Sequence, residues 1–148
     1  MGKKHFFACL FGVVLLVFLY FGWKFYQNTT RLIIPISDLT SVTVKKENGH
    51  LLLTGNAKLN QFERVSNYGA VQIDDILYIY VMKTKSIIKS DSVNEDITNI
   101  TISDSSNPPK KIYLVSGTNI EVKYKDRPEM NYIDVTKYSE KKELAIPE

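Results

Sequence analysis

The chain has 148 residues, a formal net charge of +3 at pH 7, and a hydrophobic content of 44%. Lys3, Lys4 and Lys24 account for the positive excess, so the remainder of the chain is formally neutral. A nucleic-acid-binding domain normally carries a basic face, and this charge balance argues against that class. The single cysteine, Cys9, lies near the N-terminus, so the rest of the chain can form no disulfide and must be stable through packing alone.

An apolar run without charged residues occupies residues 6–23 (FFACLFGVVLLVFLYFGW). A helix of this length spans about 27 Å, which is close to the thickness of a hydrocarbon core. Lys3 and Lys4 precede the run and Lys24 follows it, so the positive-inside rule favours a cytoplasmic N-terminus. We therefore expect a single-pass transmembrane signal anchor that contacts lipid through residues 6–23, with residues 1–5 as a basic flank in the cytoplasm.

A cleavable signal peptide is the alternative to an uncleaved anchor. Such a peptide has an apolar region of about 7 to 15 residues, followed by small residues at the cleavage site. Here the apolar run is longer, and Tyr20–Lys24 (YFGWK) does not resemble a cleavage site. The sequence favours the anchor and leaves cleavage open.

The chain beyond the anchor is long enough for one domain with its own core. We expect a short linker at residues 24–30, an extracytoplasmic β domain at residues 31–136 and a charged, fraying tail at residues 137–148. A domain without disulfides, in a chain rich in Lys, Asn, Ile and Tyr, is typical of a bacterial envelope. The domain would then lie in the periplasm or outside the cell.

The first half of the domain contains two hairpin signals. Pro35 limits residues 31–36 to an edge strand or a lead-in. Alternating apolar residues around Asn48-Gly49 predict a hairpin, because both central positions of a type I′ turn need positive φ. A second hairpin is expected around Asp74-Asp75, between residues 69–73 and 76–83. Residues 56–65 fit either a helix or a strand, and we leave this alternative open.

The second half alternates expected loops and strands. The loops are residues 89–96 and 103–111, and the strands are residues 97–102, 112–116, 120–125 and 132–135. Short strands separated by turn signals, without a long helix, predict a mainly β fold: an antiparallel β-sandwich, or a small open barrel, of about seven strands. We favour the sandwich.

The sequence offers few candidates for catalysis or metal binding. His50 follows the Asn-Gly turn and is expected to be an exposed hairpin residue. Asp74-Asp75 and Glu95-Asp96 are adjacent carboxylates, which a strand points to opposite sides, and they are expected to serve a turn and a solvated loop. We therefore predict no catalytic, cofactor-binding or metal-binding residue and no cofactor.

The strongest candidate for binding is a set of aromatic positions. Tyr78, Tyr80, Met82 and Tyr113 alternate with aliphatic residues on their strands, so they share one face of the sheet. Tyrosine is enriched in protein interfaces because a large rigid ring ends in a hydrogen-bonding group. If exposed, these four residues would bind a partner; the alternative is that they face a core.

These observations favour a non-catalytic protein-interaction module of the cell envelope, held at the membrane and bound to another envelope protein. An accessory subunit and an immunity-type protein both fit this description. The alternative class is a hydrolase acting on cell-wall glycan, with dispersed carboxylates brought together by the fold.

Overall fold

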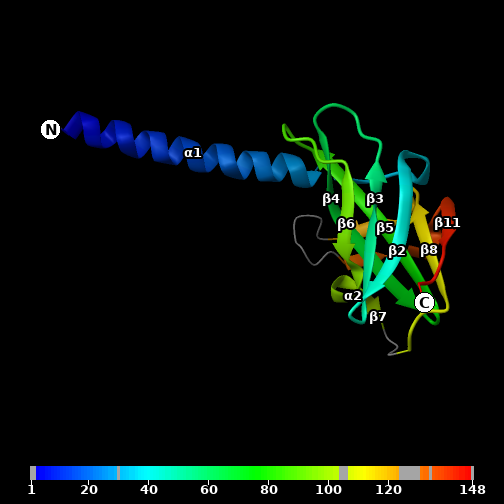
Figure 1. The fold of residues 1–148 in the computed structure, drawn as a ribbon. Helices are drawn as coiled ribbons and strands as arrows, with labels where there is room; N and C mark the ends of the chain where they lie inside the picture. Colours follow the sequence, from blue (N-terminus) through cyan, green and yellow to red (C-terminus); the bar gives the residue numbers. More distant parts are fainter. Residues whose placement is uncertain (1–2, 30, 104–106, 124–130, 134, 148) are drawn as a thin grey trace.

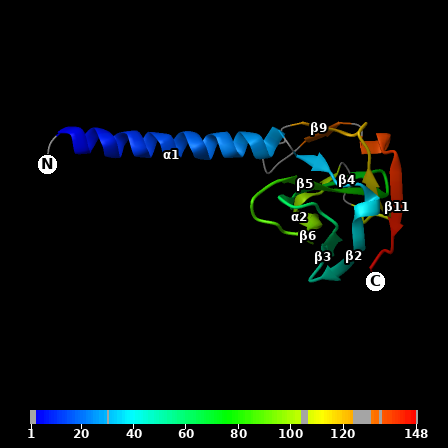
Figure 2. The ribbon, with the colours of Figure 1, turned by 90° about the horizontal axis from the view of Figure 1, so that it is seen from above.

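The computed structural model describes residues 3–29, 31–103, 107–123, 131–133 and 135–147. Helix α1 (Lys3–Thr29) projects from a β domain (Figures 1 and 2). Within the described residues, α1 alone is long and apolar enough to cross a membrane, with a mean hydropathy of 2.4 over an 18-residue stretch of the candidate span Lys3–Tyr26. The predicted linker at residues 24–30 is largely helical, because α1 continues past the apolar run to Thr29.

Strands are the main type of secondary structure among the described residues, as the sequence predicts. The strands are β1 (Leu32–Ile33), β2 (Leu39–Glu47), β3 (His50–Ala57), β4 (Glu63–Ile73), β5 (Ile76–Lys85), β6 (Ser92–Asp96), β7 (Ile102–Ser103), β8 (Lys111–Ser116), β9 (Glu121–Lys123), β10 (Asn131–Ile133) and β11 (Glu140–Leu144). The shorter helical elements are α2 (Ile97–Ile100) and the 3₁₀ turns η1 (Ile36–Asp38) and η2 (Val135–Lys137).

Two sheets form the predicted β-sandwich. The larger sheet has the order β11-β8-β5-β4-β7, with β1 also paired to β5, and the smaller sheet has the order β2-β3-β6. Strands β9 and β10 form a separate two-stranded ladder. Most pairs are antiparallel, but β5 pairs with β8, and β4 with β7, in parallel. The sandwich is thus confirmed, with more strands than expected and two parallel pairs.

Strand β5 lies in the centre of the larger sheet and is apolar on both faces. Leu77, Ile79 and Val81 belong to the main hydrophobic cluster, together with residues of the smaller sheet such as Leu53 and Val93. Burial of both faces is possible because the sheet is covered on both sides.

The opposite face of β5 has a second, smaller core. Tyr78, Tyr80 and Met82 belong to a cluster that also contains Ile120 and Val135, from the segment that follows β8. The cover of this face therefore comes from the last third of the chain.

Both predicted hairpins are confirmed. Asn48 and Gly49 have φ angles of 51° and 80°, which are the positive values that a type I′ turn requires. Asp74, with a φ angle of 56°, lies in the turn between β4 and β5. The ambiguous residues 56–65 contain the end of β3, a connection and the start of β4, so the strand alternative is the closer one.

The expectations for residues 89–102 are wrong. The predicted loop contains β6, and the predicted strand begins with α2. Asp96 causes the change, because its carboxylate accepts a hydrogen bond from the Thr98 N–H and caps α2. The Thr101 hydroxyl, which donates to the Ile97 carbonyl, closes the other end.

The tail predicted to fray is also ordered. Residues 140–144 form β11, which pairs with β8 from Glu140 opposite Ser116 to Leu144 opposite Ile112. Leu144 is buried, while the charged residues before it are exposed. Charged side chains are suited to an edge strand because they discourage further pairing. Of the strand predicted at residues 120–125, residues 121–123 form β9 and residues 124 and 125 lie outside the described residues.

Candidate binding site

The predicted tyrosine surface is largely covered by the chain itself. Tyr80 and Met82 are each 1% exposed, Tyr78 is 8% exposed, and Tyr113 is half-buried. Of the two alternatives that the sequence leaves open, an exposed surface or a core, the structure places Tyr78, Tyr80 and Met82 in a core. The residues that share this cluster include Val71, Val115, Ile120 and Val135, with Tyr138 packed against it.

The rim of this cluster is an aromatic group covered by a lysine of the same chain. The Tyr78 ring lies 6.1 Å from the Tyr113 ring and 6.2 Å from the Tyr138 ring, between centroids. The Lys141 amine lies 4.7 Å from the Tyr113 centroid, within the range of a cation–π contact. Burial, followed by the neighbouring tyrosines, raises the pKa of Tyr78. The three tyrosines thus form a packed edge of the domain, and Lys141 of the same chain occupies the position that a cation of a partner could take.

His50 makes a specific contact that its expected exposure did not indicate. Its Nδ1 lies 2.8 Å from Oδ2 of Asp96, and the His50 side chain is 45% exposed. The same oxygen of Asp96 accepts a hydrogen bond from the Asn99 amide at 3.1 Å. Asp96 therefore ties the β2–β3 hairpin to α2, which is a structural role for both residues.

The adjacent carboxylates of Asp74 and Asp75 have the turn role that the sequence predicts. Both are exposed and lie between β4 and β5. The carbonyl of Asp75 accepts hydrogen bonds from the N–H groups of Lys110 and Lys111, at 2.7 and 3.2 Å. This turn thus fixes the start of β8 beside β5.

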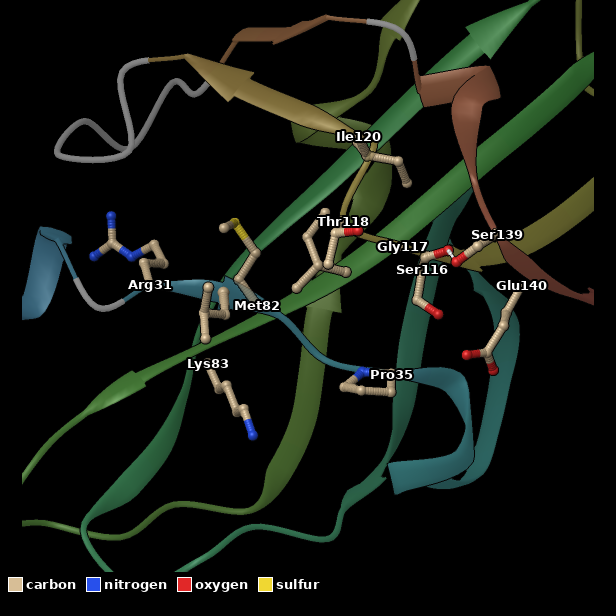
Figure 3. A pocket seen from close by; sticks show the side chains of 12 residues that line it. Arg31, Pro35, Met82, Lys83, Ser116, Gly117, Thr118, Ile120, Ser139 and Glu140 are labelled. Carbon is tan, nitrogen blue, oxygen red and sulfur yellow. Dashed lines mark hydrogen bonds between the residues drawn. The ribbon is translucent and has the colours of Figure 1, made fainter.

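A cleft of about 480 Å³ lies where the larger sheet divides (Figure 3). Strand β8 pairs with the first half of β5, and β1 pairs with the second half, at Met82 and Lys83. The chain after β1 crosses the gap between them, since the Ile34 N–H donates to the Val81 carbonyl and the Ile36 N–H donates to the Ser116 hydroxyl. The cleft is lined by Arg31, Leu32, Ile33, Pro35, Met82, Lys83, Ser116, Gly117, Thr118, Ile120, Ser139 and Glu140.

The lining of the cleft combines apolar and polar groups. Ile33, Met82 and Ile120 are apolar, whereas Arg31 and Glu140 bring opposite charges. The Arg31 side chain is held in place, because its Nε donates to the Ser66 hydroxyl at 3.2 Å. Ligand pockets typically have this composition, with apolar walls and a few placed polar groups.

Glu63 organises the charges beside the cleft. Its carboxylate lies 3.2 Å from the Lys83 amine and 3.6 Å from the Lys85 amine, and it accepts the Asn60 N–H at 2.9 Å. Burial works to raise the pKa of Glu63, but the Asn60 hydrogen bond and the two lysines outweigh it, so the pKa lies below its ordinary value of 4.5. Glu63 therefore remains ionised and holds Lys83 at the cleft.

A second cleft, of about 450 Å³, lies at the end of the domain that contains the β2–β3 turn. Gly49 and Leu51 of that hairpin line it, together with Pro108, Pro109 and Pro147. The amide of the buried Gln72 also lines this cleft, but it is engaged, because it donates to the carbonyls of Asp74 and Asn107. Lys46 brings a positive charge to its lining, and none of the described lining residues brings a negative one.

The described residues contain no group of three or more His, Cys, Asp or Glu side chains that could hold a metal ion. A comparison with protein-family models, with curated protein sequences and with solved structures found no match for the chain. Functional inference therefore depends on the geometry of the domain and on its position next to an apolar helix.

Sequence reasoning did not identify the residues of the first cleft. Arg31, Ser116, Ser139 and Glu140 come from segments that are distant in the chain and carry no local motif. The one local signal is Pro35, which lies between β1 and η1. A proline has no N–H to donate, so it marks the point where the pairing of β1 with β5 ends.

Proposed function

We propose that the chain is a non-catalytic protein-interaction module of a bacterial envelope, anchored by α1 with its β domain outside the cytoplasm. The observation that carries the proposal is the cleft between β1 and β8, which combines apolar walls with both signs of charge. Its volume suits one or two side chains of a partner, the kind of pocket in which interface hot spots are found.

The position of the cleft supports a partner at the membrane. Arg31 lines the cleft and lies two residues after the end of α1 at Thr29. Two residues span at most about 7 Å of extended chain. A protein bound in the cleft would thus lie near the bilayer surface, as a neighbouring membrane protein or its juxtamembrane segment does. An accessory subunit and an immunity-type protein both meet this requirement.

The alternative of a glycan hydrolase gains no support from the carboxylates that the sequence singled out. Asp74 and Asp75 belong to a turn, and Asp96 is engaged by His50 and by the cap of α2. A hydrolase needs two carboxyl groups on either side of a glycosidic bond.

Photo-crosslinking in cells tests the partner. A photoreactive residue at Thr118, an exposed residue of the cleft lining, is expected to capture one defined envelope protein, identified by mass spectrometry. Thr43, an exposed residue of β2 outside the cleft, is the matched position and should capture none. Equal yields at Thr118 and Thr43 would contradict the proposal.

A pair of charge reversals on β11 tests the cleft itself. Glu140→Arg changes a lining residue, whereas Glu143→Arg changes an exposed residue of the same strand outside the lining. We expect E140R to reduce crosslinking from Thr118 at least several-fold, and E143R to leave it unchanged. Circular dichroism of both variants controls for folding.

Topology requires a separate measurement. Protease added to intact spheroplasts is expected to digest the domain after α1, because Lys3 and Lys4 favour a cytoplasmic N-terminus. Protection of the domain until the membrane is broken would place it in the cytoplasm and refute this orientation.

A further inference from the structure

We propose that the β domain itself contacts the lipid headgroup interface, through an apolar tip made of Phe62, Ile87 and Ile88. These side chains are 54%, 75% and 67% exposed, respectively. This contact is additional to α1 and does not depend on the protein partner proposed above or on which leaflet the domain faces.

Strand register directs the tip toward the membrane. Strand β1 leaves the end of α1 and pairs antiparallel with β5, with Leu32 opposite Lys83 and Ile33 opposite Met82. Because the two strands run in opposite directions, β5 beyond Lys83 runs back toward α1. The loop that follows β5 therefore lies on the side of the domain to which α1 is attached (Figures 1 and 2).

Hydrogen bonds fix the loop that presents Ile87 and Ile88. At its start, the Ser86 N–H donates to the Phe62 carbonyl at 2.7 Å, and the Ser86 hydroxyl accepts the Ile88 N–H at 3.1 Å. At its end, the Ser90 carbonyl accepts the Val65 N–H at 2.8 Å. Both ends are thus attached to the β4 segment, so the exposed isoleucines belong to a fixed loop.

Phe62 joins the tip in an unusual backbone conformation. Its φ angle is 64°, in the left-handed region that bulky residues rarely adopt and that costs about 1–2 kcal/mol. Its carbonyl accepts the Ser86 N–H, which places Phe62 level with the start of the isoleucine loop. Phe62 is thus strained and exposed, and it lies beside two exposed isoleucines. Insertion of these side chains into an apolar environment would explain this arrangement.

Lysines lie close to the tip residues in the sequence. Lys58 and Lys89 are exposed, and Lys85 lies at the end of β5 with its side chain 44% exposed. Apolar side chains flanked by lysines suit the boundary between acyl chains and anionic headgroups. The proposed occupant is therefore an anionic bilayer surface.

The length of α1 beyond the apolar run brings the tip within reach of the lipid headgroups. From Trp23, where the apolar run ends, six further helical residues lead to Thr29 and rise about 9 Å. The headgroup layer on each side of a bilayer is roughly 5–8 Å thick. The domain thus begins at the outer edge of the headgroups, and side chains directed back toward α1 would enter them.

Fluorescence quenching in vesicles tests this contact with the full chain. In a Cys9→Ser background, a polarity-sensitive label is attached at Lys89→Cys, beside the tip, or at Asn48→Cys, in the β2–β3 turn. With vesicles containing phosphatidylglycerol, we expect strong quenching by doxyl-labelled lipid at position 89 and quenching near background at position 48. Equal quenching at the two positions would overturn the proposal.

The variant Phe62→Asn/Ile87→Asn/Ile88→Asn separates lipid contact from mere proximity. It should reduce quenching at position 89 to the level at position 48, while circular dichroism reports an intact β domain. Quenching that persists in this variant would overturn the assignment of the tip. Quenching that is unchanged in pure phosphatidylcholine vesicles would overturn the role of the lysines. Shielding of position 89 that depends on chain density, without lipid quenching, would identify a second copy as the occupant.

Discussion

The ring of Tyr80 lies across Gly69 on the neighbouring strand, and a Cβ atom at position 69 would be 2.0 Å from the Tyr80 Cζ. Gly69 and Tyr80 are direct partners in the antiparallel pair of β4 and β5. Because Gly69 has no side chain, Tyr80, the largest fully buried side chain among the described residues, can pack over it. The second core thus depends on a glycine that no turn requires.

Gly69→Ala should destabilise the domain. The added methyl group forces the buried Tyr80 ring to move, and overpacking of this kind costs about 2 kcal/mol. Urea unfolding of the full chain in detergent, followed by circular dichroism, measures the loss. In Gly69→Ala/Tyr80→Leu the two changes should be less than additive, because the clash is gone. A midpoint unchanged by Gly69→Ala would contradict the packing described here.

Glu63 should make the domain sensitive to acid. Because its folded-state pKa lies below its ordinary value of 4.5, the stability it contributes is present above that value and is lost as the pH falls through the lower folded pKa. We expect Glu63→Gln to lower the free energy of unfolding by about 2 kcal/mol at neutral pH, through loss of the contacts with Lys83 and Asn60.

The pH dependence of the free energy of unfolding distinguishes the charge of Glu63 from the packing of its side chain. The difference in stability between wild type and Glu63→Gln should shrink as the pH falls below about 4.5. Parallel stability curves over that range would show that the ionised carboxylate contributes nothing. Glu143→Gln, an exposed change on β11, serves as the matched control.

Asp96→Ala should loosen the junction between the β2–β3 hairpin and α2. The change removes the cap of α2 and the contact with His50, and loss of a helix cap costs about 1 kcal/mol. Hydrogen exchange should accelerate at the Thr98 amide and at the end of the hairpin. Asn94→Ala, an exposed change on β6, should leave this exchange unaltered.

Leu144→Ala tests whether the C-terminal segment belongs to the folded domain. Leu144 is 5% exposed and joins the main core opposite Ile112, so its truncation should cost about 2–3 kcal/mol. Lys142→Ala, an exposed change on the same strand, should alter stability by less than about 0.5 kcal/mol. Equal stability of the two variants would show that the segment does not belong to the folded domain and frays, as its charge leads us to expect.

The comparison of sequence and structure shows where local patterns are sufficient. The hairpins around Asn48-Gly49 and Asp74-Asp75 could be predicted because turn residues and neighbouring strands specify them together. Helix α2 could not, because a side-chain cap at Asp96 overrides the alternation of the residues after it. Strand β11 was missed because its partner, β8, is distant in the chain.

For the candidate sites, too, local sequence predicts some features, while others depend on distant segments of the chain. Alternation correctly placed Tyr78, Tyr80 and Met82 on one face of β5, opposite the aliphatic residues. It could not reveal that Ile120 and Val135 would cover that face, because this depends on the path of the chain after β8. The cleft beside β1 depends on the same kind of long-range arrangement.

The pairing of β1 with β5 also determines how mechanical load enters the domain. Tension from the membrane reaches β1 first, and β1 is two residues long and bonded to the central strand. The hydrogen bonds of β1 to β5 and the bond from Ile34 to Val81 are therefore the first that such a pull loads. The short strand β1 would thus be the first part of the domain to resist a pull on the helix.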